Sequence, residues 1–480
     1  MASTYKTPGV YVEEIPKFPP SVAEVSTAVP AFIGYTQKNT DEKGQSLHNK
    51  PTRITSLLEY ENYFGKGQNE DNLEISYAEE QNSSGATTKE VFSIAFNGAS
   101  SRHVMYYAMQ AYFANGGGPC YIVSVGLFKA AVGDHLVLAE LNDGLDALAK
   151  EDEPTLIVFP EGQKMAENDY YTLQNNALAQ CNKLQDRFSI MDLFDTGETL
   201  VTSGQVNTAA TAFRNGITSP NVKYGAAYFP NIKTVFRYQY AEALINVVHN
   251  LNGGAGNGTL TGQALSAIKG SNTASYGKLK LAIDQHPVIL PPSSAMAGVY
   301  AAVDSSRGVW KAPANVGLNA VSNLTFKVTN DIQDGLNVDA TSGKSINCLR
   351  PFTGKGILVW GARTLAGNDN EWRYIPVRRL FNMVEESCMK ATGQFVFEPN
   401  DANTWSKVRA MISNFLTVLW RQGALAGAKP EHAFYVSCGI GSTMSALDIL
   451  EGKMIVEIGM AAVRPAEFII LRFSHKMQES

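Results

Sequence analysis

Apolar runs alternate with helix-period segments through the middle of the chain. Runs rich in β-branched and aromatic residues predict four strands, at residues 120–125, 155–159, 188–193 and 224–229. Between the second and third of them, apolar residues recur at three- or four-residue steps from Leu173 to Phe188, and a second helical pattern follows the fourth strand, from 240 to 248. Because strands that alternate with helices build a parallel sheet with helices packed on it, we expect an α/β layer here.

The last third of the chain has a different pattern, with two amphipathic helices followed by short strands. The first helix carries an apolar face on Val377, Leu380, Phe381, Val384, Cys388 and Ala391. The second begins after the capping residues Asn400, Asp401 and Asn403, and its apolar face holds Val408, Met411, Ile412, Phe415, Leu416 and Leu419. Strand-like stretches follow at 433–438, 454–458 and 468–473. We therefore expect an α+β domain that closes with a strand apolar on both faces.

The first third of the chain is less regular. Residues 1–30 contain five prolines around the β-favouring Val10, Tyr11 and Val12, which predicts an extended arm. A strand without a local partner pairs either with another chain or with an edge of this chain's own sheet. Residues 37–102 are polar and turn-rich, and a helical pattern from Ser101 ends at the Asn and Gly residues 115–118.

These patterns divide the chain into four expected parts. Residues 1–27 form an extended amino-terminal arm, and residues 28–118 form a β-rich, partly variable outer region. Residues 119–345 form the α/β domain, in which 253–276 is expected to be an exposed loop, and residues 346–480 form the α+β carboxy-terminal domain. The expected fold class is therefore a multidomain α/β and α+β protein.

The composition is that of an ordinary globular protein. Of the 480 residues, 44% are hydrophobic and 18% are charged, which excludes disorder for the bulk of the chain. No apolar run reaches the roughly 18 residues that cross a bilayer, so we expect no direct membrane insertion. The first residues lack the basic-then-apolar order of a signal peptide, which predicts cytoplasmic synthesis without conventional export.

Charge is distributed unevenly along the chain. The net charge of −5, from 40 basic and 45 acidic residues, gives no argument for binding nucleic acid. Residues 344–480 hold 16 basic and 12 acidic residues, a net of +4, and the first 343 residues hold 24 and 33, a net of −9. This asymmetry indicates either a difference in surface composition or a domain that docks on an acidic protein surface.

Residue types with catalytic or metal-binding chemistry are scattered. The five cysteines form no CxxC pair and the seven histidines form no HExxH, so we expect buried thiols, no metal and no other cofactor. The glycine-rich loops that bind nucleotide phosphates are absent, and Ser437 lacks the leading glycine of GxSxG. We therefore expect no enzyme. A non-catalytic binding module and a cryptic hydrolase on the α/β domain are the alternatives.

One segment is more specific than the rest. Residues 291–315 read PPSSAMAGVYAAVDSSRGVWKAPAN, in which two prolines open a turn and the small residues 295–303 suit close helix packing. Taken alone, this is either a tightly packed helix under a domain interface or a ligand loop. The segment resembles the signature of contractile tail sheath proteins, which occur in phage tails and in phage-tail-like contractile injection systems.

Other stretches match the same family in the same order. They are residues 5–15 (YKTPGVYVEEI), 27–35 (TAVPAFIGY), 115–123 (NGGGPCYIV), 356–365 (GILVWGARTL), 371–380 (EWRYIPVRRL), 396–401 (VFEPND) and 465–469 (PAEFI). Residues 40–100 and 250–285 match nothing in the family, which is typical of a variable outer surface.

The resemblance implies a structural subunit. Such subunits polymerise as stacked helical rings around an inner tube and contract to drive the tube through a target envelope. Their α/β domain is subtilisin-like without proteolysis and uses no cofactor. The implied partners are further copies of the chain, the inner tube protein, and baseplate and terminal cap proteins. The implied location is a cytoplasmic assembly, part of a phage tail or tail-like particle that lysis releases.

The resemblance also assigns two sets of contact residues. Sheath subunits donate the amino-terminal arm and the carboxy-terminal strand to sheets of their neighbours, which assigns strand exchange to Val10, Tyr11, Val12, Glu13, Phe468, Ile469, Ile470 and Leu471. On the second helix, Lys407, Asn414 and Arg421 recur every seven residues, with Arg409 near them, and are candidates for contacting an acidic tube. A solvated polar face is the alternative. Exposed ion pairs contribute only about 0–1 kcal/mol each, which suits contacts that break on firing.

Overall fold

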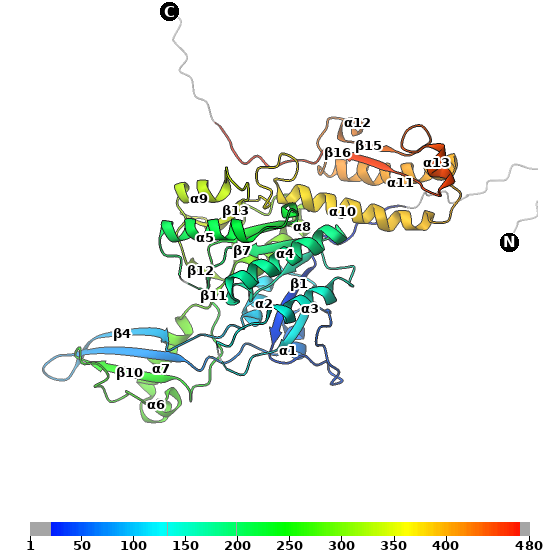
Figure 1. Ribbon diagram of the computed structural model, residues 1–480. Coiled ribbons are helices and arrows are strands. Elements are labelled where there is room, and N and C mark those ends of the chain that lie inside the picture. The colour runs from blue at the N-terminus through cyan, green and yellow to red at the C-terminus, as the bar shows by residue number, and fades with distance from the viewer. Residues whose placement is uncertain (1–20, 132, 198, 471–480) are drawn as a thin grey trace, which may run out of the picture. The chain divides into compact units, whose positions relative to one another are not determined.

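The computed structural model describes residues 21–131, 133–197 and 199–470 (Figure 1). Contacts between residues divide these into two units. Unit 1 holds residues 21–25 and 384–463, and unit 2 holds residues 26–383 and 464–470. The chain therefore passes from one unit to the other three times, at 25/26, 383/384 and 463/464.

Unit 2 is organised around an eight-stranded sheet. Its order is β14-β13-β8-β7-β6-β1-β5-β2. The bounds are β14 Gly356–Trp360, β13 Ile346–Phe352, β8 Gly225–Phe229, β7 Phe188–Asp192, β6 Leu156–Val158, β1 Pro30–Thr36, β5 Cys120–Leu127 and β2 Thr52–Ile54. The six inner strands are parallel, and only β2 and β14 at the edges run antiparallel to their neighbours. The predicted parallel layer is therefore present, and most positions of its inner strands are buried because both faces are covered.

Helices cover both faces of this sheet (Figure 1). One face carries α3 Leu138–Leu148, α4 Glu167–Leu184, α5 Ser203–Gly216 and α9 Asn330–Asn337. The other carries α1 Leu57–Phe64, α2 Met105–Ala114 and α8 Ser293–Arg307. Along β1 the side chains alternate between the two cores, so that Ala31 and Ile33 face the first and Phe32 faces the second. α1 follows the N-cap Ser56, two residues after the end of β2.

The helices α2 and α8 pack closely, as the small residues 295–303 predict. A Cβ atom on Gly298 would lie 2.5 Å from the carbonyl oxygen of Tyr112, and one on Gly116 would lie 2.8 Å from Cβ of Ala302. The two helices therefore approach to a distance that only glycine permits at these positions.

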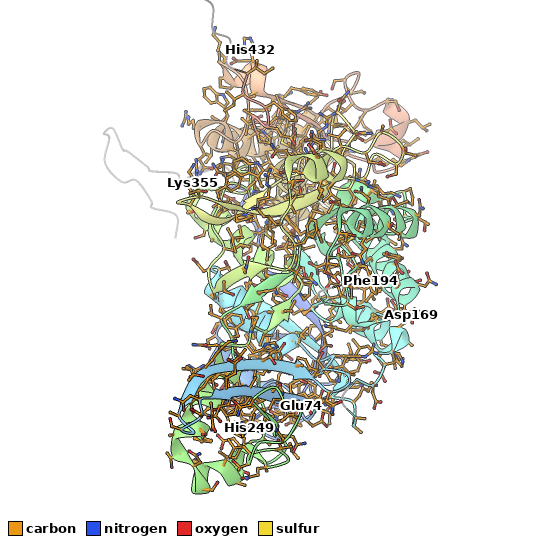
Figure 2. The ribbon with its side chains drawn as sticks, turned by 90° about the vertical axis from the view of Figure 1, so that its left-hand side faces the viewer. Glu74, Asp169, Phe194, His249, Lys355 and His432 are labelled. Atoms are coloured by element: carbon orange, nitrogen blue, oxygen red, sulfur yellow. The ribbon has the colours of Figure 1, made fainter. Side chains whose placement is uncertain are left out.

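Two smaller sheets complete unit 2. One has the order β10-β3-β4, with β10 Asn246–Leu251, β3 Leu73–Gln81 and β4 Thr87–Phe96, and it packs on α6 Leu265–Ser271 and α7 Thr273–Gln285. Glu74 marks β3 and His249 marks β10 in Figure 2. The other has the order β11-β9-β12, with β11 Ile289–Leu290, β9 Ile232–Thr234 and β12 Val321–Leu324.

The region 240–285 differs from the prediction. The helix expected at 240–248 is a turn followed by β10, because Val247 and His249 alternate with more exposed residues and pair in register with β3. The loop expected at 253–276 contains all of α6 and the start of α7. Leu265, Ile268 and Leu279 bury the apolar sides of these two helices against the small sheet.

The division of the chain also differs from the expected boundaries. The central strand β1 lies in the range assigned to an outer region, so residues 28–118 do not stand apart from residues 119–345. β13 and β14 lie beyond 345 yet belong to the large sheet. Long-range strand pairing, which spacing along the chain does not reveal, joins these parts.

Unit 1 contains most of the elements predicted for the end of the chain, but the strand expected at 468–473 is absent over its described residues 468–470, which belong to unit 2. α10 Ile375–Thr392 begins in unit 2 and ends in unit 1, and α11 Ala402–Arg421 starts at Asp401, whose side chain caps it. The other elements are α12 Pro430–Ala433, β15 Phe434–Ser437, α13 Ala446–Leu450 and β16 Glu457–Met460. The apolar face predicted for α11 is buried, and Glu386 and Lys390 form an i, i+4 ion pair of 2.6 Å. None of the described helices is long and apolar enough to cross a membrane.

Replacing Gly298 by alanine tests the close approach of α2 and α8. The added methyl group must displace the backbone of α2, so we expect G298A to destabilise unit 2 by about 1–3 kcal/mol. Gly335 on α9 would meet no atom within 4 Å of an added Cβ, so G335A is the matched control and is expected to be neutral or slightly stabilising. Chemical denaturation of both variants measures this difference, and equal stabilities would contradict the packing argument.

Candidate functional site

An ion pair between Arg363 and Glu467 holds the last described residues to the rest of unit 2. Arg363 places its guanidinium on Glu467 with Nε 2.9 Å from Oε1 and Nη2 2.6 Å from Oε2. The Asn337 amide donates to the same carboxylate at 2.8 Å, and the Tyr374 hydroxyl donates at 3.2 Å. Partial burial acts to raise the pKa of Glu467, but the hydrogen bonds from Arg363 and Asn337 hold it below its usual value. We call Asn337, Arg363, Tyr374 and Glu467 the carboxy-terminal anchor.

The predicted exchange residues that follow this anchor are apolar and exposed. Phe468, Ile469 and Ile470 are 71%, 80% and 77% exposed and lie in no strand. The rest of the expected strand, from Leu471 to 473, lies outside the described residues. No part of the described chain covers this apolar segment. Such exposure is typical of a segment that becomes buried by pairing with a partner.

A second ionic contact lies where the chain enters the large sheet. Arg379 and Asp304 pair with Nη2 2.5 Å from Oδ2, and their side chains are 3% and 5% exposed. Thr27 joins them, because its hydroxyl donates to Asp304 at 2.6 Å and its carbonyl oxygen accepts from Arg379 at 2.8 Å. The Thr155 hydroxyl donates to the same carbonyl. We call Thr27, Thr155, Asp304 and Arg379 the amino-terminal anchor.

The exchange residues predicted for the arm lie outside the described residues. Val10, Tyr11, Val12 and Glu13 all precede residue 21, where the described part of the chain begins. Residues 21–26 have no regular secondary structure, and the Val25 amide donates to the Ser387 hydroxyl within unit 1.

Unit 1 presents a small sheet with open edges. β15 and β16 pair antiparallel, with Phe434 opposite Met460, and neither pairs with another named strand of the described chain. A groove of about 820 Å³ lies beside them, lined by Met389 of α10, Phe397, Met454 and Ile458 of β16 among others. Phe397 is fully exposed at 102%. Two strands alone are marginally stable, so an open edge beside an apolar groove is suited to further strands.

The helix α11 carries positive charge on its solvent side. It contains Lys407, Arg409 and Arg421 and no acidic residue. Lys407, Asn414 and Arg421 are exposed and share one stripe opposite the buried face. Arg409 is also exposed, but at 100° per residue it lies about 200° around the helix from Lys407. Its positive charge acts to lower the pKa of Cys438, against the burial that raises it. The predicted stripe therefore holds three of the four candidates.

The carboxyl ends of the parallel strands, where α/β proteins bind ligands, hold buried polar groups. Asp192 at the end of β7 is 3% exposed and accepts from the backbone amide of Ser293 at 2.8 Å. Burial raises the pKa of Asp192 to about 7, against the hydrogen bond from the Ser293 backbone amide that lowers it. The hydroxyls of Ser293 and Ser294 are buried and have no hydrogen-bond partner in the described chain. The two serines are 0% and 1% exposed, so neither is open to solvent as a hydrolase nucleophile is.

Further groups agree with a packing role. All five cysteines are free and buried, as predicted, and burial raises the pKa of Cys348 to about 12. No group of three or more His, Cys, Asp or Glu side chains within the described residues could hold a metal ion. The described chain thus combines a packed α/β unit with exposed apolar surface, which is typical of a subunit that works in an assembly.

Solved structures match the chain along nearly its whole length. The sheath of the extracellular contractile injection system PVC in its contracted state is 32% identical, with 99% of each chain covered and a TM-score of 0.64. The helical sheath of the anti-feeding prophage in its contracted state is 33% identical, covering 98% of this chain and 100% of that chain, with a TM-score of 0.62. A chain of the anti-feeding prophage baseplate is 34% identical over 99% of this chain and 100% of that one, with a TM-score of 0.62.

Sequence comparisons point to the same proteins. The family model described as the phage tail sheath C-terminal domain matches residues 367–476. The tail sheath protein of Vibrio phage KVP40 is 24% identical over 38% of this chain and 26% of its own length. That of Burkholderia phage BcepMu is 30% identical over 29% of this chain and 30% of its own length. The chain thus matches less than a third of the length of these curated relatives.

The solved structures fix the family, because identities above 30% extend over complete chains. The chain belongs to the contractile tail sheath proteins, the family that its motifs resemble.

Sequence reasoning missed the residues of both anchors. Glu467 is the only charged residue in the stretch AEFIIL, and a lone carboxylate beside exposed apolar residues was the available signal. Arg379 lies next to Arg378 on α10. The sequence pattern of this helix indicates an apolar face and gives no sign that Arg379 has a buried partner.

Replacing Asp192 by asparagine tests its protonation. A carboxyl whose folded pKa exceeds its unfolded pKa destabilises the protein as pH rises between the two values, here from about 4 to about 7. We expect the stability of D192N relative to the natural protein to increase by about 1.4 kcal/mol per pH unit across that window. Thermal melting at pH 5 and pH 7 measures this, with the exposed Asp146→Asn as the control. A stability difference between D192N and the natural protein that does not change with pH would contradict a buried protonated acid.

Proposed function

We propose that this chain is the structural subunit of a contractile sheath, which polymerises helically around an inner tube and contracts to drive the tube through a target envelope. The observation that carries the proposal is the match to sheath subunits at 32% and 33% identity over whole chains. Those solved assemblies are contracted sheaths, and a related chain occurs in a baseplate. Further copies of this chain, and a baseplate, are accordingly its first proposed partners.

Copies of the chain are joined, in this proposal, by exchanged strands. Phe468, Ile469 and Ile470, continuing to Leu471, pair with the β15–β16 sheet of a neighbour, as do Val10, Tyr11, Val12 and Glu13 of the arm. The exposure of residues 468–470 and the unpaired edges of β15 and β16 support this. Backbone pairing survives rotation of the subunits as long as the connecting chain permits it.

The inner tube is the second proposed partner, and the stripe of Lys407, Asn414 and Arg421 is its contact. The absence of acidic residues on α11 supports an acidic surface on the tube. Arg409 is a weaker candidate, because it projects from another side of the helix. A terminal cap protein completes the set of partners, and we propose no nucleic acid and no membrane insertion.

The proposal includes no catalysis and no cofactor. The α/β domain is proposed to be subtilisin-like without proteolysis, and the buried, unpartnered Ser293 and Ser294 support the loss of any hydrolase role. A non-catalytic binding module is the second candidate, favoured only by the apolar groove of unit 1. Synthesis and assembly are proposed to occur in the cytoplasm, in a tail or tail-like particle that lysis releases.

Electron microscopy of the purified chain tests strand exchange. We expect hollow tubes from the full chain and monomers after deletion of residues 1–20. The double variant V10P/V12P keeps the length but removes two backbone donors, so it should also give monomers. V10T/V12T keeps β-branched residues and should still assemble. Monomers from the natural chain in the presence of tube protein, or tubes from the deletion variant, would contradict the proposal.

Charge reversal on α11 tests the contact with the tube. K407E/R421E places two negative charges on the stripe, so we expect co-sedimentation with tube protein to fall about tenfold or more at low salt, since each close like-charge contact opposes docking. K429E/K453E changes two other exposed lysines of unit 1 by the same charge and should bind normally. Equal binding by both variants would leave the stripe as a solvated face and contradict this contact.

A further inference from the structure

Among the described residues 464–470, hydrogen bonds to the rest of unit 2 are made by one residue, Glu467. The last backbone hydrogen bond before them is donated by Val463 to the carbonyl oxygen of Ala424 within unit 1. Residues 464–470 take part in no backbone hydrogen bond with the rest of the described chain. Of their side chains, only Glu467 has a hydrogen-bond or ion-pair partner among the described residues.

Arg363 is built to hold Glu467 in one position. It is 4% exposed, and its own backbone is fixed by Asn347, which accepts from its amide and donates to its carbonyl oxygen, each at 2.8 Å. Its Nη1 donates to the carbonyl oxygen of Asn337 at 3.3 Å. These hydrogen bonds hold the Arg363 guanidinium in one place. Its two hydrogen bonds to the Glu467 carboxylate therefore fix the orientation of that carboxylate as well as its position.

The same construction recurs at the root of the other exchange segment. There the buried pair of Arg379 and Asp304 holds the carbonyl oxygen and the hydroxyl of Thr27. The guanidinium of Arg379 also lies 4.7 Å from the ring centre of Tyr300. Two unrelated stretches of chain are thus held by an arginine and a carboxylate just where packed structure gives way to exposed segments.

We propose that Arg363 and Glu467 are positioning residues of the carboxy-terminal exchange segment. With the anchor formed, Glu467 is the last fixed residue and residue 468 is the first that can move. The free connection, which is the stretch of chain between the last fixed residue and the segment paired with a neighbour, is then as short as possible. The inference rests on the proposed function, because it assumes that residues 468 onward pair with another copy.

Chain geometry gives the consequence of breaking the anchor. Val463 becomes the last fixed residue, so residues 464–467 join the free connection. Four extended residues add roughly 13–14 Å of reach. A longer free connection lowers the effective concentration of the exchange segment at its acceptor and loosens the orientation that the connection imposes between subunits.

A spin label on residue 469 tests the anchor itself. The label is attached to I469C, and because all five native cysteines are buried they do not compete for it. The measurement uses the monomer fraction of the full chain with V10P/V12P, so that pairing between copies does not affect the label. We expect E467Q and R363Q each to shorten the rotational correlation time of the label about threefold. E451Q, the same change at an exposed carboxylate of unit 1, should leave it unchanged.

The double variant R363Q/E467Q separates positioning from stability. Each single variant leaves a buried polar group without its partner, whereas the double variant removes both charges. We expect it to recover most of the lost thermal stability while the label stays mobile. A merely structural pair would lower the melting temperature and leave the label as immobile as in the parent, and that result would overturn the inference.

Microscopy of E467Q with its natural arm distinguishes this inference from the proposed function. If the anchor positions the segment, E467Q should still form tubes, but shorter ones with poorer helical order than E451Q. Tubes identical in length and order, with an unchanged label, would overturn the anchor and leave the proposed function intact. If the natural chain gives no tubes while the label is released in E467Q, the proposed function fails and the anchor stands.

Discussion

The position of β1 in the middle of the large sheet is the constraint on which the rest of unit 2 depends. β1 pairs in parallel with β5 on one side and β6 on the other, and its alternate side chains enter both hydrophobic cores. Because β1 is paired along both edges, it fixes the point at which the preceding residues enter the sheet. Thr27, three residues before β1, is held by the buried pair of Arg379 and Asp304 at that point.

Each anchor pairs a buried arginine with a carboxylate, although apolar side chains fill most of both cores. Removing two charges from water costs about as much as their attraction returns, so such pairs add little net stability. Separating the two partners, however, leaves a buried charge without compensation. The chain is therefore held in the one position in which the pair forms. Both anchors lie at the ends of the packed α/β unit, where defined position matters more than additional stability.

The sequence allowed the local elements to be predicted, but not their long-range partners. Strands β5 to β8 and helices α10 and α11 have clear periodicity, and Asp401 caps α11 as its residue type suggests. The prediction for 240–248 was wrong because Val247 and Val248 fit either a helix or a strand. Its strand state depends on pairing with β3, about 170 residues earlier in the chain.

The candidate site was predictable to the same degree. The exposed apolar segment and the basic stripe follow from residue type and spacing, and so could be named in advance. The anchors could not, because Arg363 and Glu467 are separated by 104 positions and meet only through the fold. Arg409 was grouped with the stripe by proximity in sequence, although two residues along a helix point to nearly opposite sides.

The two kinds of exposed surface have different physical properties, and this difference bears on contraction. Burial of apolar groups such as Phe468 and Ile469 is not screened by salt and is proportional to area, so the strand contacts proposed for this segment would persist through rearrangement. The contacts proposed for Lys407 and Arg421 would be individually weak and screened by salt, so they could break without separating a large buried surface. A sheath needs both properties, because its subunits must stay connected to one another while they release the tube. The apolar surface lies on the terminal segment and beside β16, and the basic surface lies on α11. In the proposed assembly, connection and release therefore belong to different elements of the same chain.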